Sequence, residues 1–197
     1  MPGPPFIGLT GGIGAGKSEA VKALSRLGAA TLSTDAVAHS LLDEAGVRAR
    51  LIERWGTDIL DGEYLDRDRI AAIVFEEPDE LKWLESVLHP LVRERVVAWR
   101  ESLDGGEVIG VVEVPLLHEG GMDSIFDATL CVTADSARRS ERAQARGLSS
   151  IDARADRQLS QEEKAARSTY LISNDGTLEE LEAKLRALLP ALRAATG

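Results

Sequence analysis

Apolar residues gather in five short runs along the chain, and polar residues do not alternate with them. The runs occupy residues 6–10, 29–33, 108–114, 128–133 and 170–173. Strands that are covered by helices on both faces have this unalternating pattern, which is typical of parallel sheets. The pattern therefore predicts a mainly parallel, five-stranded sheet.

Between these runs, apolar residues recur at helical spacing over residues 17–27, 136–146 and 177–194. Alternating strands and helices predict a doubly wound α/β fold, whose ligand binds beyond the carboxyl ends of the strands. We assign this core to residues 1–34, 105–135 and 169–197.

The stretch over residues 35–104 is too long for a simple crossover, and helical patterns fill it. Pro78 and Pro90 are expected at helix starts, where the missing N–H is not needed. We predict that this insertion is a helical domain for a second substrate, and that residues 136–168, rich in arginine, form a small lid. The helices expected in the insertion span residues 36–44, 47–55, 67–75, 79–88 and 91–103.

A glycine-rich sequence joins the first predicted strand to the first predicted helix. It fits the pattern G-x-x-x-x-G-K-[ST] from Gly11 to Ser18. Its glycines let consecutive backbone N–H groups face a phosphate, and the following helix adds the positive end of its dipole. Lys17 can reach the β- and γ-phosphates, and Ser18 can bind Mg²⁺. A turn that only caps a helix is the alternative, but the order strand, loop, helix favours a nucleoside triphosphate site. The predicted ATP-binding residues here are Gly11, Gly12, Ile13, Gly14, Ala15, Gly16, Lys17, Ser18 and Glu19.

Three further features suit phosphoryl transfer, and each has a purely structural alternative. Asp35 follows the second predicted strand, where it either caps a helix or orients an attacking hydroxyl. Arg142 and Arg146 share a helix face and either hold phosphoryl oxygens or form a surface pair. Residues 174–176, Asn-Asp-Gly, form a tight turn or read the edge of a base.

Net charge, apolar content and cysteine content argue against several classes of protein. The net charge of −10 over 197 residues argues against general nucleic-acid binding, although the segment from Arg138 to Arg167 is net positive. No window is apolar and long enough to cross a membrane, and the N-terminus does not look like a signal peptide. The single cysteine, Cys131, is expected to be a buried strand thiol rather than a nucleophile. These features point to the cytoplasm.

Several motifs of other nucleotide-binding classes are missing from the sequence. The run 108–114 does not end in the aspartate that holds Mg²⁺ in motors and switch GTPases, and the guanine-reading sequence Asn-Lys-x-Asp does not occur. His39, His89 and His118 lack the spacing of metal ligands, so no zinc site is indicated. A small-molecule kinase is favoured over a GTPase switch.

Motifs along nearly the whole chain resemble those of the dephospho-CoA kinase family. They are the segments 9–18 and 35–38, then 88–91 (Leu-His-Pro-Leu) and 114–119 (Val-Pro-Leu-Leu-His-Glu), and finally Arg142, Arg146, 154–159 and 172–176. The resemblance implies a P-loop kinase core, a helical domain for dephospho-CoA and a mobile lid. It also implies an ATP-dependent kinase that uses Mg²⁺ and transfers the γ-phosphoryl group to the 3′-hydroxyl of the ribose in dephospho-CoA. That reaction is the last step of coenzyme A synthesis.

The resemblance also implies roles for individual residues. Asp35 matches the family aspartate that contacts the acceptor hydroxyl, and His39 and His89 fall in the acceptor-binding segments. Arg142 and Arg146 match lid arginines. Asn174 falls in the segment near adenine.

Three positions depart from the family pattern. Ser33 stands where the family usually has the first carboxylate of Asp-x-Asp, so Asp35 is alone. Glu19 follows Ser18 where a threonine is common, and His39 stands where an arginine is frequent. Two other interpretations stay open: a P-loop kinase of another small metabolite, and a regulator that binds ATP without transferring phosphate.

Overall fold

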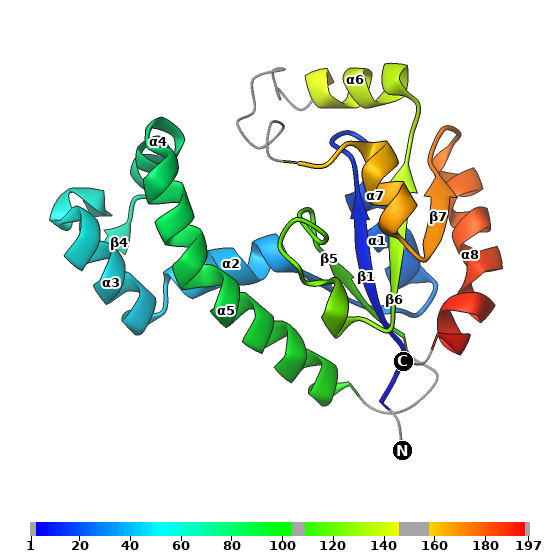
Figure 1. The fold of residues 1–197 in the computed structure, drawn as a ribbon, viewed down its shortest axis with the longest axis horizontal. Helices are drawn as coiled ribbons and strands as arrows, with labels where there is room; N and C mark the ends of the chain where they lie inside the picture. Colours follow the sequence, from blue (N-terminus) through cyan, green and yellow to red (C-terminus); the bar gives the residue numbers. More distant parts are fainter. Residues whose placement is uncertain (1–2, 104–108, 146–157, 196–197) are drawn as a thin grey trace. The chain divides into compact units, whose positions relative to one another are not determined.

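A five-stranded parallel sheet forms the centre of the larger part of the molecule (Figure 1). The computed structural model describes residues 3–103, 109–145 and 158–195. The strand order is β2-β5-β1-β6-β7, and all five predicted strands are confirmed. The strands are β1 (Phe6–Gly11), β2 (Ala30–Ser33), β5 (Gly110–Glu113), β6 (Ala128–Thr133) and β7 (Tyr170–Ser173).

Helices cover both faces of this sheet, as the unalternating apolar runs predicted. On one face, α1 (Lys17–Arg26) and α8 (Leu178–Ala194) pack against each other and share one buried cluster with the strands. Leu24, Leu185 and Leu130 are fully buried in that cluster. On the other face, α7 (Gln161–Arg167) packs against β1 and β6. The doubly wound α/β fold is therefore confirmed.

The thiol of Cys131 lies in β6 and is fully buried. Burial raises its pKa above the ordinary value for a thiol, because a thiolate is poorly solvated there. The expectation of a buried strand thiol is confirmed.

Residues 34–96 form a second compact unit, which is mostly helical. Leu51, Ile59 and Val87 are among its buried residues. Its elements are α2 (Thr34–Leu42), α3 (Ala45–Trp55), η1 (Thr57–Ile59), β3 (Leu60–Asp61), β4 (Tyr64–Leu65), α4 (Arg67–Glu76) and the first part of α5 (Pro78–Ser102).

One predicted helix boundary is wrong. Pro78 opens α5 as expected, but Pro90 lies inside that helix rather than at the start of a new one. Proline removes one backbone hydrogen bond from a helix interior. The apolar face continues past it with Leu88, Val92 and Val96 buried, so packing keeps the helix in one piece.

The pair β3–β4 and helix α7 are among the elements that were not predicted. The antiparallel pair β3–β4 has only two residues in each strand, too few for a periodicity to appear. Helix α7 has no apolar stripe from which it could be predicted. The one side chain that it buries fully is that of Lys164. Its start is marked instead by a capping box in which Ser160 and Glu163 bond each other's backbone.

Lys164 joins α7 to the loop that follows β5. Its ammonium group pairs with a carboxylate oxygen of Glu119 at 3.1 Å and donates to the carbonyl of Pro115. Glu119 also accepts a hydrogen bond from the backbone N–H of Leu159 at 2.8 Å. Burial alone would raise the pKa of Glu119, but these hydrogen bonds and Lys164 hold that pKa below its usual range. The pair thus connects the loop after β5 to α7 and the residues just before it, two segments that are distant in sequence.

We expect Lys164→Met to lower the free energy of unfolding by about 3 kcal/mol, because it leaves the Glu119 carboxylate without its cation. Denaturant unfolding measures the effect. The double variant Lys164→Met with Glu119→Gln removes both charges and keeps an acceptor for Leu159, so it should recover most of the loss. A single variant as stable as the unmodified protein would show that the pair carries no such constraint.

Candidate active site

A glycine-rich loop, Gly11–Ser18, lies at the carboxyl ends of the parallel strands, and we call this segment the phosphate loop. It leaves the central strand β1 and enters α1 directly, as the motif predicted. Gly14 and Gly16 have φ values of +74° and +92°, a left-handed backbone that favours glycine. A Cβ at Gly16 would lie 2.1 Å from Nδ2 of Asn174, so a side chain also has no space there. The loop requires glycine at both positions.

Lys17 folds back over the start of the phosphate loop. Its Nζ donates to the carbonyl oxygens of Gly11 at 3.0 Å and of Gly12 at 3.1 Å. The helix α1 begins at Lys17, and Gly16 before it has no side chain with which to cap the first N–H groups. A helix start of this kind, with an ammonium group beside it, can bind the phosphates of a nucleotide.

Ser18 and Glu113 bring two oxygen donors together at the ends of α1 and β5. The hydroxyl of Ser18 donates to a carboxylate oxygen of Glu113 at 3.4 Å. Parallel pairing places Glu113 opposite Leu9 on one side and Ser33 on the other. A hydroxyl and a carboxylate suit Mg²⁺, which takes few protein oxygens and otherwise binds water and substrate phosphates. The chemistry of this donor pair therefore fits the ion that the resemblance implies.

Glu113 was not predicted from the sequence, because an aspartate was expected at the end of that strand. A glutamate reaches the same edge of the sheet with one more methylene group. The signal was its position, the last residue of an apolar strand. Among the described residues, no group of three or more His, Cys, Asp or Glu side chains is arranged to hold a metal.

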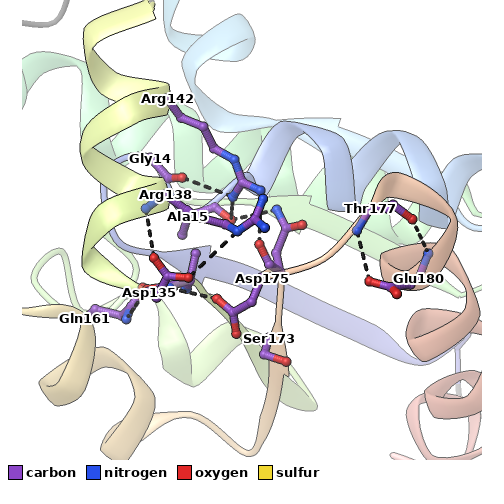
Figure 2. A network of polar contacts seen from close by, with 12 residues as sticks. Gly14, Ala15, Asp135, Arg138, Arg142, Gln161, Ser173, Asp175, Thr177 and Glu180 are labelled. Carbon is purple, nitrogen blue, oxygen red and sulfur yellow. Dashed lines mark hydrogen bonds and ion pairs between the residues drawn. The ribbon is translucent and has the colours of Figure 1, made fainter.

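Arg142 and Asn174 connect neighbouring elements to the phosphate loop. Figure 2 shows Arg142 beside Gly14 and Ala15. Arg142, on α6 (Ser136–Ala145), donates through Nη2 to the carbonyl of Asn174 at 3.0 Å, and its Nη1 lies 3.5 Å from the carbonyl of Gly14 and 3.4 Å from that of Ala15. The Asn174 amide donates to the carbonyl of Ala15 at 2.9 Å, and this side chain is almost fully buried. The structure thus brings Arg142 and Asn174 to the phosphate loop.

Arg146, the second arginine of the predicted pair, lies outside the described residues. So does the segment 154–157 of the family motifs.

The turn after β7 also holds the start of α6 in place. The carboxylate of Asp175 accepts from the backbone N–H of Asp135 at 2.7 Å, and Asp135 in turn accepts from the N–H of Arg138 at 2.8 Å (Figure 2). Thr177 and Glu180 form the capping box that opens α8. Residues 174–176 therefore connect β7 to α8 and hold the start of α6, in addition to the contact of Asn174 with the loop.

The predicted acceptor residues belong to the second compact unit. Asp35 and His39 lie on α2 and His89 lies within α5, all three with exposed side chains. The helix α2 begins at Thr34, so Asp35 stands in its first turn rather than at the capping position. The helix dipole stabilises a negative charge in the first turn of a helix. The side chain of Asp35 is exposed to solvent.

Glu19 lies in the first turn of α1. Its carboxylate pairs with Lys22 at 2.8 Å, within the same helix. This pair is largely exposed, so it contributes little to stability, but it gives the Glu19 carboxylate a partner on its own helix.

The fold and the phosphate loop together define a P-loop kinase. A shikimate kinase from Acinetobacter baumannii has the same fold, with a TM-score of 0.50, 15% sequence identity, and coverage of 95% of this chain and 94% of that one. Phosphoryl-transferring proteins of the P-loop class use a glycine loop with a lysine and oxygen donors for Mg²⁺. This chain has a glycine loop with Lys17, and the Ser18–Glu113 oxygen pair lies beside it.

Sequence comparison gives the family. The model described as dephospho-CoA kinase matches residues 5–180. A dephospho-CoA kinase of Deinococcus radiodurans is 41% identical over 193 residues, which cover 96% of this chain and 93% of the relative. The crystal structure of TT1252 from Thermus thermophilus has a TM-score of 0.80 and 36% identity, and covers 99% of this chain and all of that one. The chain belongs to the dephospho-CoA kinase family.

No helix of the described residues is both long enough and apolar enough to span a membrane.

We expect Gly16→Ala to destabilise the protein by about 1–3 kcal/mol and to weaken ATP binding, because the new methyl group meets Asn174 and the backbone is left-handed. Thermal unfolding and calorimetric titration with ATP measure the two effects. Gly46→Ala is the matched control, since its Cβ meets nothing within 4 Å and it lies in α3. That control should keep ATP affinity; an unaltered Gly16→Ala protein would contradict the geometry.

Proposed function

We propose that the protein transfers the γ-phosphoryl group of ATP to the 3′-hydroxyl of the ribose in dephospho-CoA, with coenzyme A and ADP as products. The family match over residues 5–180 carries this proposal, and the phosphate loop supplies the chemistry. The acceptor oxygen forms a bond to the γ-phosphorus while the bond from that phosphorus to the β–γ bridging oxygen breaks. The hydroxyl proton leaves to a carboxylate, and ADP is the leaving group.

The donor half of the reaction falls to the phosphate loop. Phosphoryl transfer needs positioned reactants and neutralised charge more than covalent chemistry. Backbone N–H groups at the start of α1 would hold phosphate oxygens, and Lys17 would move from the Gly11 and Gly12 carbonyls toward the β- and γ-phosphates. Ser18 and Glu113 would hold Mg²⁺, which when bound neutralises charge on those phosphates.

Arg142 and Asn174 would serve the nucleotide from the side of the loop. Arg142 already lies beside the carbonyls of Gly14 and Ala15, so a short movement of its guanidinium reaches a phosphate in the loop. Asn174 keeps one buried side-chain oxygen without a hydrogen bond, which suits an amino group on a base. Arg146 would join Arg142 from the same lid segment, residues 136–168.

The acceptor half of the reaction falls to residues 35–104. Asp35 would accept the proton of the 3′-hydroxyl or orient that hydroxyl, and His39 and His89 would contact the rest of dephospho-CoA. The exposed side chain of Asp35 supports this proposal, since a substrate hydroxyl can reach a carboxylate that is open to solvent.

We expect ADP release to depend on dephospho-CoA and not to appear with shikimate, adenosine, AMP or no acceptor. A coupled assay with ATP and Mg²⁺ measures this. Lys17→Ala should abolish the dephospho-CoA-dependent rate, while Lys22→Ala, on the next turn of α1, should keep it. Equal ADP release with and without dephospho-CoA would overturn the proposal in favour of an ATP-binding regulator or a hydrolase.

For Asp35→Asn we expect kcat to fall by roughly 100-fold or more with little change in the KM for ATP, as for a positioned proton acceptor. Steady-state kinetics separates the two constants. Asp79→Asn is the matched control, because Asp79 is also an exposed carboxylate in the first turn of a helix. If kcat is the same in Asp35→Asn and Asp79→Asn, Asp35 only stabilises its helix.

A further inference from the structure

Helix α6 lies directly against the phosphate loop through Arg139. A Cβ at Gly14 would lie 2.4 Å from the carbonyl oxygen of Arg139, so the two backbones are in close contact. A Cβ at Gly12 would lie 2.9 Å from Nη1 of the same arginine. The guanidinium group of Arg139 therefore lies over the start of the loop.

The other cations around the loop each have a partner. Lys17 donates to the carbonyls of Gly11 and Gly12, and Arg142 lies among carbonyls of the loop and of Asn174. Arg138, one residue before Arg139, points away to Asp135 at 3.8 Å and is largely exposed. These groups are held in place by acceptors of the protein.

Arg139 differs from its neighbours in this respect. Its Nε is buried and makes no hydrogen bond, and the part of the chain that the structure describes gives its guanidinium no ion pair. The side-chain oxygen of Gln161, which also lies near Gly12, is already bonded to the backbone N–H of Ala134 at 2.9 Å. Burying an arginine donor without an acceptor is unfavourable, so the protein keeps it here at a cost.

The chemistry of a guanidinium group indicates what would satisfy it. Arginine presents several N–H donors in a plane and binds phosphate through two parallel hydrogen bonds. Arg139 lies at Gly12, the same end of the loop where the ammonium of Lys17 is held, and Lys17 is the residue that reaches the β- and γ-phosphates. Spacing of three residues also puts Arg139 and Arg142 on one face of α6.

We propose that Arg139 binds the β- and γ-phosphate oxygens of the nucleoside triphosphate, as a further cation of the donor site besides Lys17 and Arg142. The proposal deepens the proposed function and rests on it for the identity of the donor as ATP. The required ligand chemistry is a polyphosphate chain, and the base and the acceptor have no part in it.

The test compares Arg139→Gln, Arg139→Lys and the control Arg138→Gln in the full-length protein. Calorimetric titration with a non-hydrolysable ATP analogue and with inorganic triphosphate measures binding without turnover. Arg139→Gln should weaken both ligands by about tenfold or more, because it removes a hydrogen-bonded charge. Arg139→Lys keeps the charge without the planar fork and should fall between Arg139→Gln and the unmodified protein. Arg138→Gln should bind both ligands as the unmodified protein does.

Unchanged affinity for both ligands in Arg139→Gln would overturn the assignment. A loss for the ATP analogue alone would also overturn it, since that result puts Arg139 at the base or ribose. Thermal unfolding of each variant guards against loss of the fold, and Arg139→Lys answers the question if Arg139→Gln does not fold. A protein that binds the analogue but fails to phosphorylate dephospho-CoA contradicts the proposed function and leaves this comparison intact.

Discussion

Parallel hydrogen bonding of β1 to β5 on one side and to β6 on the other brings three strand ends to one edge of the sheet. The loop after β1 carries the glycines and Lys17, β5 ends at Glu113, and the segment after β6 leads into α6 with its arginines. Because the register pairs Leu9 with Glu113, the Ser18 hydroxyl at the start of α1 meets that carboxylate. A shift of one residue would turn Glu113 to the other face and separate these two oxygens.

The phosphate loop is built mainly from backbone groups, and its surroundings hold it through carbonyl oxygens. Asn174 fastens Ala15, Arg142 approaches Gly14 and Ala15, and Lys17 covers Gly11 and Gly12. These contacts are all made to carbonyl oxygens of the loop. They hold the backbone of the loop in place, which under the proposed function would lower the cost of ordering it when ATP binds.

Much of this arrangement was predictable, and the exceptions have physical causes. Unbroken apolar runs identify buried parallel strands, and the glycine pattern identifies the loop, because both depend on local sequence. Glu113 was missed because only an aspartate was expected at the end of β5, although a glutamate there can reach the same site. Pro90 was misplaced because buried Val92 and Val96 outweigh one lost hydrogen bond. Helix α7 escaped notice because it buries Lys164, whose partner Glu119 is 45 residues away in sequence and brought near only by the fold.

The proposed reaction is defined by the atom that receives the phosphoryl group. The most direct measurement is to incubate the unmodified protein with ATP, Mg²⁺ and dephospho-CoA and to identify the product by phosphorus NMR and mass spectrometry. If the proposed function is correct, we expect one new phosphomonoester on the 3′-oxygen of the ribose for each ADP released. Phosphate on any other oxygen, or ADP released with free phosphate and no modified dephospho-CoA, would contradict it.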